Sequence, residues 1–110
     1  MARTHSMIRQ FDVFRNPLRA ERAAKPFVVS VQHRRLDHLN TRVVAPLVID
    51  APIRDESRLY PTIAVESKTL HLDPTELIAL PARLLGNPVA NLEPQRAKII
   101  AAIDIVLTGT

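Results

Sequence analysis

The sequence predicts a mainly β fold, in which five to seven short antiparallel strands form a small curled barrel or sandwich, followed by one C-terminal helix. Two observations predict it. Short β-branched segments alternate with turn signals that include most of the nine prolines, and the apolar pattern changes period once, near the end. The 110 residues are 46% hydrophobic, which fits one ordered domain. We assign this domain to residues 7–110 and expect residues 1–6 to be an extension or tag remnant.

Three segments in the first half have the composition of strands, and turn residues separate them. The charged residues 17–25 and the polar residues 34–40 are predicted as the connections. Pro46 has no N–H group, so its strand is expected to lie at an edge or to carry a bulge. The three predicted strands are residues 7–14, 27–33 and 41–50.

The second half begins with a charged excursion over residues 51–59 and continues with a predicted hairpin. Its strands are residues 60–66 and 68–73, joined at Glu66-Ser67. Leu70 and Leu72 alternate with Thr69 and His71, so the leucines should face the core and His71 the solvent. Two short apolar pieces follow, residues 75–80 and 82–85, which Pro81 separates.

The last segment, residues 95–107, is predicted to be a helix. Pro94 suits a first helical position because its missing N–H is not needed there. Between Ile99 and Leu107 only Asp104 is polar, and a helix that is apolar all round is buried on more than one side. We therefore expect one face on the sheet and another on a partner chain, most simply in a homodimer. The alternative is a helix that is central within one chain.

The net charge of +4 is unevenly distributed. Residues 1–42 hold nine Lys/Arg and three Asp/Glu, a balance of +6, whereas residues 43–110 hold six and eight, a balance of −2. A basic half suggests an acidic partner, either nucleic acid or an acidic peptide. The four aromatic residues lie in strand-like contexts that favour core packing over base stacking. The basic loop formed by Arg15, Arg19, Arg22 and Lys25 is either a solvated face or a docking strip.

No residue pattern supports catalysis, and no cofactor or metal is implied. The chain has no cysteine and only two glycines, which excludes cysteine nucleophiles and glycine-rich phosphate loops. His33 and His38 flank Asp37, which is a weak metal signal because a metal site needs three or four ligands. No apolar run approaches the roughly 18 residues of a membrane span, and we expect a cytoplasmic protein.

Several segments occur together in an order that is typical of one family. They are Phe11-Asp12-Val13-Phe14, Phe27-Val28-Val29-Ser30-Val31-Gln32, Leu36-Asp37, Thr41-Arg42-Val43-Val44-Ala45-Pro46-Leu47, Leu59-Tyr60-Pro61, Leu84-Leu85-Gly86, Val89-Ala90-Asn91-Leu92 and the apolar helix that ends in Gly109 plus one residue. Together these segments resemble the CcdB toxins over residues 7–110. The resemblance implies an SH3-like barrel with a C-terminal helix, a homodimer, and a toxin of a type II toxin–antitoxin module. It further implies binding to the GyrA subunit of DNA gyrase, which traps the cleaved DNA complex, and a CcdA-like antitoxin that neutralises the toxin through its disordered C-terminal segment and supplies the contacts to operator DNA.

The resemblance places the gyrase-binding residues in a turn and at the end of the helix. The family ends in Trp-Gly-Ile, and here the ending is Thr108-Gly109-Thr110. An aromatic anchor contributes about 2 kcal/mol or more to an interface, so its loss predicts target binding that is weaker by about thirtyfold or more. The implied binding residues are Arg35, Leu36, Asp104, Leu107, Thr108, Gly109 and Thr110.

Two alternatives follow from this resemblance. One is a non-poisonous homologue that retains antitoxin binding and operon regulation. The other is an endoribonuclease of the MazF type, which shares the fold. Arg42 with Thr41, or a loop histidine, would then have to supply the acid–base pair.

Overall fold

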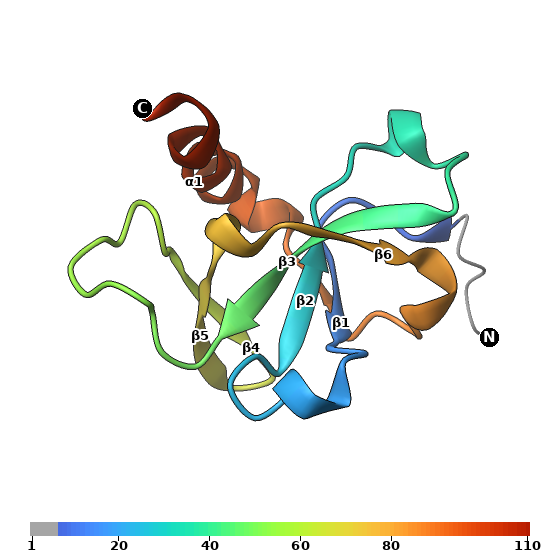
Figure 1. Cartoon of the computed structure of the whole chain (residues 1–110), viewed down its shortest axis with the longest axis horizontal. Coiled ribbons are helices and arrows are strands. Elements are labelled where there is room, and N and C mark those ends of the chain that lie inside the picture. The colour runs from blue at the N-terminus through green and yellow to red at the C-terminus, as the bar shows by residue number, and fades with distance from the viewer. Residues whose placement is uncertain (1–6) are drawn as a thin grey trace.

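The computed structural model describes residues 7–110, so the extension expected at residues 1–6 lies outside the described part. Antiparallel strands form a nearly closed barrel, and one helix at the C-terminal end packs against it (Figure 1). The predicted fold class is confirmed. The strands are β1 (Asp12–Arg15), β2 (Phe27–Ser30), β3 (Thr41–Val48), β4 (Thr62–Val65), β5 (Lys68–Leu72), β6 (Ile78–Pro81) and β7 (Ala90–Asn91), and the helix is α1 (Arg96–Thr108).

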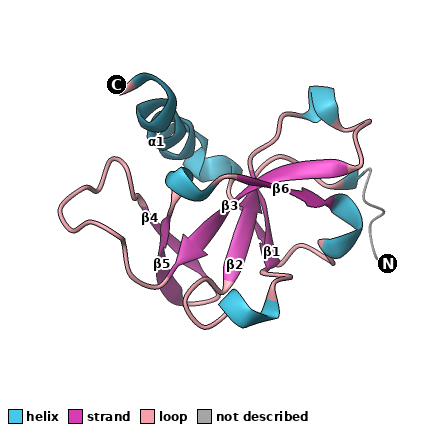
Figure 2. Cartoon of the chain, viewed as in Figure 1, coloured by secondary structure: helices cyan, strands magenta, loops and turns pink. Residues whose placement is uncertain are grey.

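Within residues 7–110, short turns of 3-10 helix lie between the strands and before α1, and they are drawn as helices in Figure 2. The sheet runs in the order β4-β5-β3-β2-β1-β7, and β6 pairs with the first half of β3. All the pairings are antiparallel, as short connections between successive strands require. The turns are η2 (Arg19–Glu21), η3 (Arg34–Leu36), η4 (Pro74–Glu76), η5 (Ala82–Leu84) and η6 (Glu93–Gln95).

Pro46 lies in a central strand, so of the two expectations, an edge strand or a bulge, the edge strand was wrong. β3 pairs with β2 along one side, where Pro46 is opposite Val28. On its other side β3 pairs with β6 up to Val44 and with β5 from Leu47 onward. Pro46 therefore lies between the part of β3 that pairs with β6 and the part that pairs with β5. No sheet hydrogen bond requires an N–H group at this point.

The first strand is shorter than predicted, because it begins at Asp12 and not at residue 7. Phe11 has φ = 70°, a left-handed conformation that interrupts an extended chain. The Arg9 N–H donates to Asp12 Oδ2 at 2.8 Å, and the Asp12 N–H donates to the Arg9 carbonyl at 3.1 Å, so these residues form a turn. The apolar spacing of this segment thus reflects burial of Ile8 and Phe11 on either side of a bend.

The predicted hairpin is confirmed. β4 and β5 pair through Val65 and Lys68, and the two turn residues Glu66 and Ser67 have φ values of 50° and 65°. Two successive positive φ values are the geometry of a type I′ turn, whose twist suits a two-residue hairpin. Leu70 and Leu72 are fully buried, as their alternation predicted.

The core has two parts, one on each face of the β1–β3 sheet. Because successive strand residues point to opposite faces, Val13 and Val29 belong to the larger cluster and Phe14 and Val28 to the smaller one. The larger cluster fills the barrel and includes two residues of α1, Ile99 and Ala102. The smaller cluster lies under β6 and η5, which supply Leu80 and Ala82.

α1 closes one side of the barrel and then extends beyond it (Figure 1). It begins and ends one residue later than the predicted segment 95–107, and Pro94 lies in the preceding η6 turn. Ile99 and Ala102 are buried, whereas Leu107 near the C-terminus is 70% exposed. Within residues 7–110 no helix has the length and apolar content needed to cross a bilayer.

Candidate target-binding site

The end of α1 presents an apolar surface that no other part of the described chain covers. Leu107 is 70% exposed and Val106 is 40% exposed, while Asp104 and Thr108 are also exposed. Leu107 is the most exposed of the large apolar side chains in residues 7–110. Four of the predicted site residues, Asp104, Leu107, Thr108 and Gly109, therefore lie together on one accessible helix end.

The backbone of this helix end is fixed by its own cap. Gly109 has φ = 79°, and its N–H donates to the Ile105 carbonyl at 2.8 Å, which is an αL cap. Thr108 Oγ1 donates to the Asp104 carbonyl at 2.7 Å and lies 2.9 Å from Thr110 Oγ1. The two threonines that replace Trp and Ile of the expected ending thus hydrogen-bond to the helix and to each other.

The other predicted contact segment is the turn η3. His33 caps it, because its Nδ1 accepts a hydrogen bond from the Arg35 N–H at 3.0 Å. Arg35 and Leu36 are exposed, and 44% of Leu36 is accessible. The turn therefore presents one charged and one apolar side chain on a backbone with a defined shape.

Gln32, which is buried, supports this turn from beneath. Its Nε2 donates to the carbonyls of Leu36 at 3.2 Å and Thr41 at 3.1 Å, while its Oε1 accepts from the Val43 N–H at 3.0 Å. The amide of Gln32, at the start of the loop, thus bonds to Leu36 within the loop and to Thr41 and Val43 just after it. The sequence suggested only that Gln32 belongs to a recognisable segment.

Arg42 holds the same loop from inside the protein and is only 1% exposed. Its Nη1 donates to the carbonyls of Leu39 at 2.7 Å and Thr41 at 2.9 Å, and its Nη2 donates to the Asp37 carbonyl at 3.3 Å. A guanidinium buried in this way cannot reach an RNA phosphate. The role of Arg42 in an acid–base pair for RNA cleavage was therefore wrong, because the alternation of side chains at the start of β3 turns Arg42 inward.

The turn and the helix end lie apart within one chain. In Figure 1 the C-terminus of α1 and the loop that carries η3 stand at opposite ends of the upper side of the molecule. Arg35 and Leu36 therefore do not form one continuous patch with Leu107 and Thr108 of the same chain. The resemblance implies that all these residues contact the same partner, whereas the structure places them on two separate surfaces of one chain.

The basic loop at residues 15–25 is partly neutralised by neighbouring acidic residues. Arg15 pairs with Glu66 at 3.3 Å, and Lys25 pairs with Glu76 at 2.7 Å and lies 3.9 Å from Glu21. The hydrogen bond to Glu76 raises the pKa of Lys25, which keeps its charge. Two of the four cations are thus engaged in pairs, which favours the interpretation of this loop as a solvated face.

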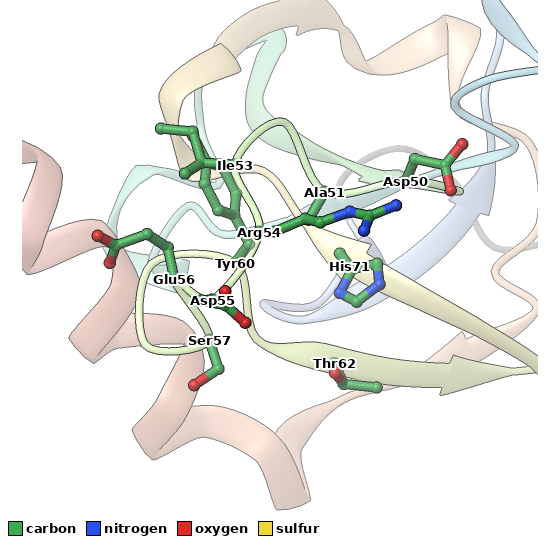
Figure 3. Close-up of a pocket in the computed structure, with 10 residues that line it drawn as sticks. All are labelled: Asp50, Ala51, Ile53, Arg54, Asp55, Glu56, Ser57, Tyr60, Thr62 and His71. Atoms are coloured by element: carbon green, nitrogen blue, oxygen red, sulfur yellow. The ribbon is translucent and has the colours of Figure 1, made fainter.

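An open pocket of about 730 Å3 lies between the loop at residues 49–61 and the β4–β5 hairpin (Figure 3). His71 lines it and is half-buried, so the expectation that this side chain faces open solvent was only partly right. Ser57 comes from the loop and is well separated from His71, so the two do not form a nucleophile–base pair. Among residues 7–110 no cluster of three or more His, Asp or Glu side chains could hold a metal ion.

Tyr60 is almost completely buried at the inner wall of this pocket. Burial raises the pKa of its hydroxyl, and the nearby charges of Asp73 and Glu56 raise it further, while a hydrogen bond with Thr75 lowers it. Each of the first three causes disfavours the phenolate. Tyr60 of the Tyr-Pro pair identified in the sequence therefore anchors the loop in the barrel in its protonated form.

Comparison with known proteins identifies one family. Residues 10–109 match the model of a protein family described as CcdB protein. No curated protein is similar to the chain at a significant level.

Proposed function

The chain belongs to the CcdB family, whose members are toxins of toxin–antitoxin systems, and we propose that it binds the GyrA subunit of DNA gyrase and traps the cleaved DNA complex. The family match over nearly the whole chain carries this proposal. The proposed function is one of binding to gyrase and not of catalysis, in keeping with the gyrase inhibition that the family match supports.

The contact residues we propose for gyrase are Asp104, Leu107, Thr108, Gly109 and Thr110 at the helix end, with Arg35 and Leu36 in the turn. The 70% exposure of Leu107 and the 44% exposure of Leu36 support this choice, since exposed apolar side chains gain most from being covered. Both segments are also held by local hydrogen bonds, so little conformational entropy is lost on binding.

The C-terminal half of α1 supports a homodimer. Ile103 and Ile105 of α1 remain only partly buried, and Val106 beside them is 40% exposed. A second copy packed near this end of α1 would cover these side chains and place the two helix ends side by side. We therefore assign dimerisation to α1.

A CcdA-like antitoxin is the proposed regulator, bound through its disordered C-terminal segment. Operator DNA would be contacted only by the antitoxin, and the complex would act in the cytoplasm, where gyrase works. All four aromatic residues of the toxin are buried, which leaves no exposed ring for base stacking. This supports contact with operator DNA through the antitoxin alone.

The proposal is tested by incubating purified protein with gyrase, plasmid DNA and ATP and measuring linear DNA after detergent and protease treatment. A Thr108→Trp variant restores an aromatic anchor, and Thr69→Trp, an exposed residue of β5, is the matched control. We expect weak cleavage by the native protein, stronger cleavage by Thr108→Trp and no gain with Thr69→Trp. Absence of cleavage with all three proteins would exclude gyrase as the target.

A second candidate, a non-poisonous homologue that binds antitoxin and regulates its operon, is favoured by the bonding of Thr108. The Thr108 hydroxyl is hydrogen-bonded to the Asp104 carbonyl and lies beside the Thr110 hydroxyl. It is therefore less available for a bond to gyrase than an unbonded side chain would be. Under this alternative the native protein binds the antitoxin and gives no gyrase cleavage at any concentration, whereas Thr108→Trp gains cleavage.

A further inference from the structure

We propose that the cleft between the η3 turn, the chain at residues 9–10 and the start of α1 binds a carboxylate-bearing segment of a partner protein. The cleft has a volume of about 640 Å3, and its walls carry Arg9, Arg34, Arg96 and His33. It adjoins Arg35 and Leu36, so the inference deepens the proposed function by naming the chemistry of the partner at that face.

The three arginines come from segments that are far apart in the sequence, and their charges are uncommitted. Within residues 7–110 none of the three guanidinium groups has a carboxylate within ion-pair distance. By contrast, Arg15, Lys25 and Arg42 each have an acidic partner. The cleft therefore brings together two arginines of the basic first part of the chain, Arg9 and Arg34, with Arg96 from the helix.

Arg96 is oriented before any ligand arrives. Its Nη1 donates to Gln10 Oε1 at 3.1 Å, and its guanidinium carbon lies 5.4 Å from the centre of the buried Phe11 ring. Gln10 is itself fixed, because its Nε2 donates to the Val31 carbonyl at 3.0 Å. An arginine held by stacking and by one hydrogen bond keeps its other N–H groups for a carboxylate and loses little side-chain entropy on binding.

His33 adds a further donor to the cleft. Its Nδ1 accepts the Arg35 N–H at 3.0 Å and so carries no proton. The proton of the neutral ring must then be on Nε2, which makes that nitrogen a hydrogen-bond donor. The cap that shapes the turn therefore also determines which tautomer of His33 faces a ligand.

The occupant that fits best is an acidic peptide segment and not a nucleic acid. Asp37 and Glu93 also line the cleft, and their carboxylates would repel a continuous row of phosphates. The buried aromatic side chains provide no stacking platform for bases. Peptides offer separate carboxylates together with amide N–H groups, and these can pair with the arginines and the two acidic residues at once.

The test measures fluorescence anisotropy of a fluorescein-labelled 12-residue peptide of alternating Glu and Gly, titrated with the full chain at 50 mM salt. The corresponding Gln-Gly peptide and a labelled 12-nucleotide oligouridylate are measured in parallel. The cleft variant is Arg34→Gln/Arg96→Gln. The matched control is Arg54→Gln/Arg83→Gln, which removes two exposed arginines elsewhere and changes the net charge equally.

We expect saturable binding of the Glu-Gly peptide, at least tenfold weaker binding to the cleft variant and less than twofold change with the control. No saturable binding, or equal weakening in both variants, would overturn the proposal in favour of a diffuse charge effect or none. Tighter binding of the oligouridylate that depends on the same two arginines would assign the cleft to nucleic acid. Gyrase is absent from this assay, so its result is independent of the cleavage experiment.

Discussion

Arg42 Nη1 lies 2.7 Å from the carbonyl oxygen of Leu39, so a strand residue that is 1% exposed holds the loop carrying the η3 turn from within. The carbonyls of Thr41 and Asp37 accept from the same guanidinium. The surface position of Arg35 and Leu36 therefore depends on a buried charge in the neighbouring strand.

Substituting Arg42 with Met is expected to lower the free energy of unfolding by about 3 kcal/mol or more, because buried carbonyls lose their donors. Equilibrium unfolding in urea, followed by circular dichroism, measures the change. The control is Arg83→Met, which removes an exposed arginine and should change stability by about 0.5 kcal/mol or less. A loss below about 1 kcal/mol for Arg42→Met would show that the loop keeps its shape without the guanidinium.

Tyr60 is the only tyrosine and the chain has no tryptophan, so absorbance at 295 nm reports the ionisation of this hydroxyl alone. Because burial and the charges of Asp73 and Glu56 raise its pKa, the folded protein should titrate above the ordinary value of 10.0. In 8 M urea the midpoint should return to about 10. A folded midpoint at or below the urea midpoint would contradict the buried position of the ring.

The same shift has a consequence for stability. A pKa that is raised in the folded state means that the contribution of Tyr60 is fully present below the unfolded pKa of about 10 and is lost as the pH rises through the folded pKa. The raised pKa of Lys25, due first to its hydrogen bond with Glu76, acts in the same direction above about 10.5. Melting temperature should therefore fall above pH 10, and Tyr60→Phe should make that fall shallower.

The sequence predicted the parts of the fold whose causes are local. The alternation of Leu70 and Leu72 fixed the face of β5, and Glu66-Ser67 marked the hairpin turn. The left-handed Phe11 and the partner change at Pro46 depend on strand pairings between distant residues, so no local pattern indicated them.

The site was predictable only where the family ending could be matched to the chain. The exposed helix end follows from the apolar run that closes the sequence, and Leu107 was identified in this way. The cleft formed by Arg9, Arg34 and Arg96 was missed because three separate segments build it. The only signal was the excess positive charge of residues 1–42, and that signal pointed equally to Arg15 and Lys25, which pair internally.

Ser67 occupies the second central position of the hairpin turn with φ = 65°, where a side chain costs energy and glycine does not. Removing this strain with Ser67→Gly is expected to stabilise the protein by about 0.5–1 kcal/mol. The conformational entropy that glycine adds to the unfolded chain offsets part of that gain. Glu66 is left in place because it pairs with Arg15. As a control, Ala64→Gly within β4 should destabilise the protein, and stabilisation by both changes in urea unfolding would contradict the turn geometry.

Gly109 and Gly86 provide a matched comparison for the helix end. A Cβ atom at either position would meet no atom within 4 Å, so neither substitution by alanine is opposed by a clash. Only Gly109 has a positive φ, 79°, and it closes the helix through its N–H bond to the Ile105 carbonyl.

Gly109→Ala should therefore cost about 1 kcal/mol of local stability at the C-terminus of α1, whereas Gly86→Ala should be close to neutral. Because the last residues can fray without global unfolding, the sensitive measurement is amide hydrogen exchange of residues 105–109. Faster exchange confined to these amides in Gly109→Ala, with Gly86→Ala unchanged, is the expected result. If the helix end also presents the gyrase-binding residues, cleavage by a Thr108→Trp protein should decrease when Gly109→Ala is added and persist when Gly86→Ala is added. Equal exchange in both variants would mean that the glycine cap does not hold the helix end.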